Sequence, residues 1–131
     1  MNKLFVPYKE SLILKDLGFN EVCFGFYNNA IADVYIKQDF NDELRGIYKG
    51  DFEAPLYQQA FRWFKEKYKL MSCITPCSDG EYIFTLYDLN KCDLEAFVED
   101  IEIMESEDSY EFFEDAELEG LKKLIEIVKN K

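Results

Sequence analysis

The sequence predicts an α+β fold, in which two β-hairpins form a small antiparallel sheet packed against two or three helices. Two turn signals, at residues 28–29 and 79–80, each separate two runs rich in aromatic and β-branched residues, as in a hairpin. Segments 54–68 and 113–129 carry apolar residues at helical spacing. The chain has 131 residues and is 48% hydrophobic, so we expect a single domain over residues 1–131.

The first helix is expected from about Pro7 to Leu17. Proline suits the first helical position, because the missing N–H has no intrahelical partner there. Gly18 suits the position just beyond the helix, where the backbone φ is positive. Leu14 and Leu17 supply the apolar edge of this helix.

The first hairpin is expected from two strands, 21–27 and 30–36, joined at an Asn-Asn pair that tolerates positive φ. Residues 37–53 are rich in charge and contain two glycines, which favours a long loop. A loop of this length in a small domain is either functional or a solvated connector, and the connector is the simpler interpretation.

The central helix is expected to begin near Ala54 and Pro55 and to continue for about four turns. Trp63 lies off its apolar stripe, and we expect it to pack against the long loop rather than to be exposed as an anchor for a partner. The stripe consists of Tyr57, Ala60, Phe61, Phe64 and Tyr68.

The second hairpin is expected from strands 71–77 and 81–87, joined by Ser78-Asp79-Gly80. A helix followed by a hairpin therefore occurs twice, with Cys23 and Cys73 in equivalent strands, which weakly suggests a duplication. Residues 109–112 read as a short strand that leads into the last helix. The predicted core consists of Leu14, Leu17, Phe24, Phe26, Val34, Phe61, Phe64, Tyr82, Phe84, Leu86, Leu118, Leu121, Ile125 and Val128.

The charge is concentrated in one segment. The chain carries 27 acidic and 15 basic residues, a net charge of −12, and no histidine. Residues 93–119 contain 13 of the acids and no Lys or Arg, so the other 104 residues are close to neutral. This balance argues against direct binding to nucleic acid, because phosphate contacts need clustered Lys and Arg.

The acidic segment does not have the composition of a disordered tail, because apolar and aromatic residues are interleaved with its acids. Leu94, Phe97, Val98 and Ile101 follow helical spacing, which predicts a short helix with one buried and one acidic face. The acidic surface is a solvated face, a docking surface for a basic protein partner, or a cation site; no EF-hand loop is present. The candidate partner-binding residues are Glu99, Asp100, Glu102, Glu105, Glu107 and Asp108.

Several catalytic chemistries are excluded by composition. Without histidine there is no Ser-His-Asp triad, no Cys-His pair and no HExxH site, and neither a phosphate-binding glycine loop nor a G-x-S-x-G elbow occurs. We expect no enzyme activity and no cofactor. The four cysteines are expected to be free thiols; a four-cysteine zinc site is the alternative, although C-x3-C spacing does not favour it. The four are Cys23, Cys73, Cys77 and Cys92.

We expect a cytoplasmic protein that does not bind a membrane. The N-terminal apolar run 4–6 is too short for the apolar region of a signal peptide, and no apolar run reaches the length of a membrane-spanning helix.

Three stretches of the chain resemble a group of small bacteriophage and prophage proteins of gut-type bacteria that have no established activity. The stretches are FVPY (5–8) with LKDLGF (14–19), APLYQQAFRWFKEKY (54–68), and EDAELEGLKKLIEIV (114–128). The resemblance covers about half of the chain and implies an accessory role in a bacterial host, including interference with host defence.

The leading hypothesis is a non-enzymatic accessory protein of phage type. It would bind a basic partner through residues 93–119 and inhibit a basic or nucleic-acid-binding host protein. The second hypothesis is a structural or assembly protein, such as a homodimer. The third is an enzyme that uses paired carboxylates, which would require two close, desolvated acids in a pocket.

Overall fold

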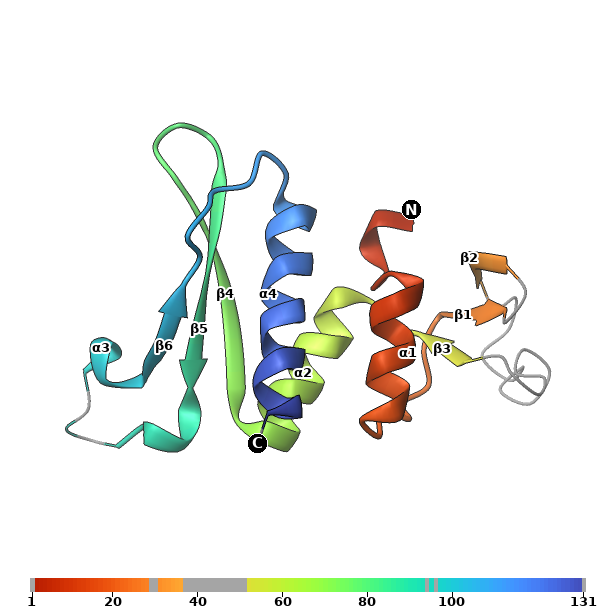
Figure 1. The fold of residues 1–131 in the computed structure, drawn as a ribbon, viewed down its shortest axis with the longest axis horizontal. Coiled ribbons are helices and arrows are strands. Elements are labelled where there is room, and N and C mark those ends of the chain that lie inside the picture. The colour runs from red at the N-terminus through yellow and green to blue at the C-terminus, as the bar shows by residue number, and fades with distance from the viewer. Residues whose placement is uncertain (1, 29–30, 37–51, 94, 96, 131) are drawn as a thin grey trace. The chain divides into compact units, whose positions relative to one another are not determined.

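The computed structural model describes residues 2–28, 31–36, 52–93, 95 and 97–130. Contacts within the chain define two compact units, Met1–Ala60 and Phe61–Lys131. The predicted α+β class is confirmed, but the prediction of one sheet is wrong. Each hairpin belongs to its own three-stranded antiparallel sheet, because each recruits a third strand from elsewhere in its unit (Figure 1).

The first unit contains α1 (Tyr8–Asp16), which follows the short 3-10 helix η1 (Asn2–Leu4) and is close to the predicted helix. Gly18 has the expected positive φ, 106°. The sheet has the order β2-β1-β3. Its strands are β1 (Gly25–Asn28), β2 (Ile31–Ile36) and β3 (Phe52–Ala54).

The third strand of this sheet, β3, corrects the prediction of a loop over 37–53. Phe52 and Glu53 pair with Tyr27 and Phe26 of β1, so the end of that segment is a strand. Phe52 is buried in the core beside Tyr27 of β1, and this packing explains why the end of the segment forms a strand and not a loop. The rest of the predicted loop, 37–51, lies outside the described residues.

The buried face of β1 is the opposite of the predicted one. Tyr27 is buried, whereas Phe24 is 48% exposed and Phe26 stacks on Tyr35 across the hairpin. The hydroxyl of Tyr27 donates a hydrogen bond to the carbonyl oxygen of Val6 at 2.6 Å. That bond lets tyrosine occupy the core without an unpaired polar group, which alternation of apolar residues alone does not reveal.

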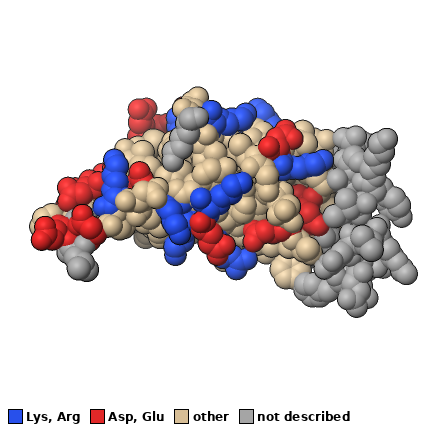
Figure 2. All heavy atoms as spheres, turned by 90° about the horizontal axis from the view of Figure 1, so that it is seen from below, with Lys and Arg blue, Asp and Glu red and all other residues tan. Residues whose placement is uncertain are grey.

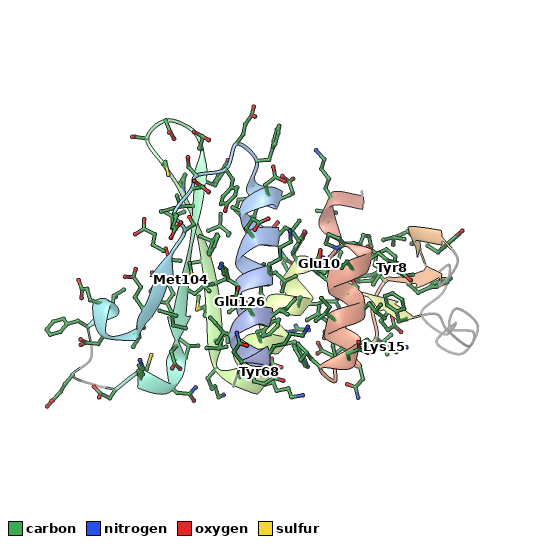
Figure 3. All side chains as sticks on the ribbon, in the orientation of Figure 1. Tyr8, Glu10, Lys15, Tyr68, Met104 and Glu126 are labelled. Carbon is green, nitrogen blue, oxygen red and sulfur yellow. The ribbon has the colours of Figure 1, made fainter. Side chains whose placement is uncertain are left out.

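An aromatic cluster holds α1 against this sheet. The ring of Tyr8 lies 5.4 Å from that of Tyr27 and 5.2 Å from that of Phe52, in edge-to-face geometry. Lys15 lies two helical turns beyond Tyr8 on α1 (Figure 3). Its ammonium is 5.7 Å from the centre of the Phe52 ring. Such arrangements add to the stabilisation from burial alone.

The central helix α2 (Tyr57–Tyr68) begins three residues later than predicted, because Ala54 ends β3. Trp63 is buried, which excludes its exposure as an anchor for a partner. Its predicted packing against the long loop falls on residues 37–51, which lie outside the described residues. Its ring packs edge-to-face on Phe64 and Tyr68, and the Lys67 ammonium lies 5.0 Å from its centre.

The second unit contains the predicted second hairpin and last helix at nearly the predicted bounds. The sheet has the order β4-β5-β6, with α4 alongside (Figure 1). Gly80, in the hairpin turn, has a φ of 90° as its position demands. The elements are β4 (Leu70–Pro76), β5 (Tyr82–Asp88), the 3-10 helix η3 (Leu89–Lys91), α3 (Val98–Ile101), β6 (Glu102–Glu105) and α4 (Phe113–Lys129).

Helix α4 packs closely on the sheet through its apolar stripe. Leu121 and Leu124 are fully buried, as is Leu86 on β5, and Phe84 on the same strand is buried. Gly120 marks the closest approach, since a Cβ atom there would lie 2.8 Å from the Oγ of Ser72. Among the described residues that hydroxyl is buried without a hydrogen-bond partner.

Two smaller predictions also need correction. The predicted strand at 109–112 is reduced to one bridge, in which Tyr110 and Tyr82 exchange backbone hydrogen bonds of 2.7 and 2.8 Å. Cys23 precedes β1 and is not in a strand, so it is not equivalent to Cys73 in β4. The weak suggestion of a duplication therefore loses one of its supports.

Candidate acidic interaction surface

All six predicted site residues lie in one continuous stretch, which we call the acidic arm and define as residues 97–108. Glu99 and Asp100 lie on α3, Glu102 and Glu105 on β6, and Glu107 and Asp108 in the turn that follows. Each of the six is exposed. Figure 2 shows acidic side chains gathered on the part of the second unit where Figure 1 places α3 and β6.

The start of the arm is a tight, self-capped turn. The carboxylate of Asp100 accepts a hydrogen bond from the N–H of Phe97 at 2.8 Å. The N–H of Asp100 donates in turn to the carbonyl oxygen of Phe97 at 3.0 Å. These reciprocal bonds fix the backbone on which Phe97 is carried, even though α3 has only one turn.

Strand β6 forms the outer edge of its sheet and is the element that sequence reasoning missed. Met104 pairs with Leu86 and Glu105 with Thr85, and Met104 is half-buried (Figure 3). The register shifts between Leu86 and Tyr87, which marks a bulge in β6 next to Met104. The sequence signal for β6 is only the alternation Ile101-Glu102-Ile103, which Met104 interrupts and which is too short to distinguish from the end of a helix.

Beyond β6 the pairing with β5 continues through a side chain. The N–H of Ser106 donates to the carbonyl oxygen of Phe84 at 2.8 Å, while the N–H of Phe84 donates to the Oγ of Ser106 at 3.2 Å. The same hydroxyl donates to the carbonyl oxygen of Asp108 at 2.9 Å. Ser106 thereby anchors the turn that carries Glu107 and Asp108 to the sheet.

Three apolar residues of the arm are exposed, whereas Ile101 and Met104 are half-buried, which corrects the prediction of a helix buried on one face. Phe97 is 73% exposed, Val98 62% and Ile103 40%. The reason is length: α3 ends after one turn at Ile101, so no continuous apolar stripe forms. Leu94, the first residue of the predicted stripe, lies outside the described residues.

No Lys or Arg neutralises the arm within the described part of the chain. None of the ion pairs between described residues involves the six acids of the arm. These pairs are Arg62–Glu66, Lys122–Glu119 and Lys123–Glu126. The exposed carboxylates of the arm therefore have no described cation paired to them, and their field extends into solvent.

Two neighbouring groups respond to this field. Burial raises the pKa of the Cys77 thiol, and the carboxylates of Asp79, Glu81 and Glu105 raise it further. Burial also raises the pKa of Tyr110, as do Glu119 and Asp108, while Lys122 lowers it. Both shifts favour the neutral form of these two groups.

The cysteines are dispersed through the fold. Cys23 is buried in the first unit, whereas Cys73, Cys77 and Cys92 belong to the second. Burial raises the pKa of Cys73 as well. Over the residues that the structure describes, no three His, Cys, Asp or Glu side chains are placed to hold a metal ion together.

Comparisons with family models, curated proteins and solved structures return no match for the chain. In the described ranges of the chain, no helix is both long and apolar enough to cross a membrane.

Proposed function

We propose that this chain is a non-enzymatic accessory protein of phage type that acts in the host cytoplasm by binding a basic protein partner through the acidic arm. Its effect would be to inhibit a basic or nucleic-acid-binding host protein. The observation that carries the proposal is that Glu99, Asp100, Glu102, Glu105, Glu107 and Asp108 are exposed on one continuous stretch, with no cation paired to them among the described residues.

The physical basis is long-range attraction. A surface of one sign accelerates encounter with a surface of the opposite sign and disfavours partners of like charge. A protein whose own ligand is nucleic acid presents clustered Lys and Arg, so an array of carboxylates is complementary to it.

The test compares two charge reversals of equal size in the folded protein. The arm variant carries Glu102→Lys, Glu105→Lys and Glu107→Lys. The control variant carries Asp16→Lys, Glu66→Lys and Glu126→Lys, which are exposed acids outside the arm. Each protein is immobilised and exposed to host lysate while the salt concentration is raised from about 0.05 to about 0.5 M.

We expect the native chain and the control variant to retain the same basic protein at low salt and to release it as the salt rises. The arm variant should retain none. Equal capture by the arm variant and the native chain would refute the proposal, and so would the absence of any basic protein captured at low salt.

A further inference from the structure

The acidic arm carries exposed apolar side chains next to its carboxylates, and this combination restricts the chemistry of a partner. Phe97 and Val98 are adjacent and are the two most exposed large apolar residues among those described. Their neighbours Glu99, Asp100 and Glu102 are exposed acids. A partner that covers this surface must present apolar groups and positive charge together.

The position of Phe97 is preorganised. Its N–H and carbonyl oxygen are both bonded to Asp100, at 2.8 and 3.0 Å. The backbone therefore loses little freedom when the ring is buried against a partner, which raises the affinity obtained from one aromatic contact. Aromatic anchors of this kind dominate the binding energy of protein interfaces.

The edge of β6 is poorly suited to pair with a strand of a partner. A bulge interrupts its register next to Met104, the strand has only four residues, and Glu102 and Glu105 place charges along it. Bulges, short strands and charges are the features that prevent edge strands from pairing. A partner segment must then satisfy its own backbone hydrogen bonds, as a helix does.

A second copy of this chain that presents its own acidic arm is disfavoured at this surface. Apposition of two acidic arms would place Glu99, Asp100 and Glu102 of one copy against carboxylates of the other without an intervening cation. Like charges placed in contact disfavour this pairing.

We infer that the acidic arm binds a basic amphipathic helix of its partner protein, with Phe97 and Val98 as apolar anchors and Glu99 and Glu102 facing Lys or Arg. This inference rests on the proposed function and specifies the partner segment that it would recognise. It corresponds to recognition of a helix by its side chains, in which apolar residues repeat at helical spacing beside the basic ones.

The experiment uses three fluorescent peptides of about 14 residues and equal charge, titrated against the whole chain. The first has Leu and Lys at helical spacing, the second alternates Val and Lys as a strand would, and the third contains Lys with Gly and Ser only. We expect the helical peptide to bind at least about tenfold more tightly than either of the others and to gain helical circular dichroism on binding.

Two protein variants complete the test. The double substitution Phe97→Ser and Val98→Ser should weaken binding of the helical peptide about tenfold or more. Leu4→Ser, which removes an exposed apolar residue outside the acidic arm, should leave this binding unchanged. Unfolding in urea establishes that both variants are folded.

The results distinguish failure of the helix inference from failure of the proposed function. Tighter binding of the alternating peptide, or unchanged binding by the double variant, would overturn the helix inference while leaving the acidic arm as the binding surface. If the Glu102→Lys, Glu105→Lys and Glu107→Lys variant also bound all peptides as the native chain does, both would fail.

Discussion

The helices α3 and α4 have similar sequence patterns but lie in opposite environments, because one is exposed and the other is buried on a sheet. Both combine apolar residues at helical spacing with acids in the first turn. Helix α4 has 17 residues and buries its stripe on the sheet, whereas α3 has four and leaves Phe97 and Val98 exposed. Periodicity therefore predicts which face of a helix is apolar, but burial depends on enough turns and an available sheet face.

The largest expected difference between the two helices is in stability. Leu121→Ala in α4 should lower the free energy of unfolding by about 3 kcal/mol, because it leaves a cavity at a fully buried site. Urea denaturation followed by circular dichroism measures this change. A loss below about 1 kcal/mol would mean that α4 is not packed as closely as described.

The close approach of α4 to the sheet gives the next effect. Gly120→Ala should destabilise the protein by about 1 kcal/mol, since the new Cβ would lie 2.8 Å from the Oγ of Ser72 and 3.4 Å from the Phe84 ring. Ser72→Ala alone should stabilise it slightly by removing a buried hydroxyl that has no described partner.

The double variant of Gly120→Ala and Ser72→Ala sharpens this prediction. Without the Oγ of Ser72, the alanine should cost less than it does alone, so the two changes should not be additive. Strict additivity in the urea midpoints would show that the hydroxyl is not the atom that limits the approach of the helix.

The pH dependence of stability is expected to come in part from α4. Burial, followed by the charge of Glu114, raises the pKa of Glu117 from 4.5 to about 7. The folded state thus holds a proton that the unfolded chain releases near pH 4.5. The contribution of Glu117 to stability is therefore greatest below pH 4.5 and is lost as the pH rises through about 7.

Glu117→Gln should remove this contribution. At pH 8 the substitution should raise the free energy of unfolding, because it removes a charge that burial disfavours. Solvent screening of this half-buried side chain limits the increase to about 1 kcal/mol, and the increase should vanish near pH 4. The control is Glu126→Gln, an exposed acid on the same helix that pairs with Lys123 at 3.3 Å. Urea unfolding at several pH values would contradict the prediction if both variants changed stability equally at every pH.

The smallest effect is expected in the arm. Phe97→Ser should change the free energy of unfolding by less than about 0.5 kcal/mol, because the ring is already 73% exposed. The urea midpoint of this variant, beside that of Leu121→Ala, measures the contrast between the two helices directly. A loss comparable to that of Leu121→Ala would show that Phe97 belongs to the core.

The segments with long patterns were predictable, and those with short ones were not. The bounds of α4 and of the hairpin β4–β5 follow from 17 residues of helical spacing and from an Asp-Gly turn. Strand β6 has four residues and β3 three, so their pairing partners, and not their own sequences, determine them. The buried face of β1 was not predictable either. It depends on the hydrogen bond from the Tyr27 hydroxyl to the carbonyl oxygen of Val6, which lets Tyr27 be buried.

The candidate site shows the same division. The sequence by itself determined that the negative charge is concentrated in residues 93–119, because charge is a property of composition and needs no fold. It also determined the α+β class, since turn signals and helical periods are local. Only the tertiary structure decided that the six acids lie together on an edge strand and its flanking turns. It alone decided, too, that Phe97 and Val98 stay exposed, because burial requires a partner surface that the described residues of this chain do not provide to α3.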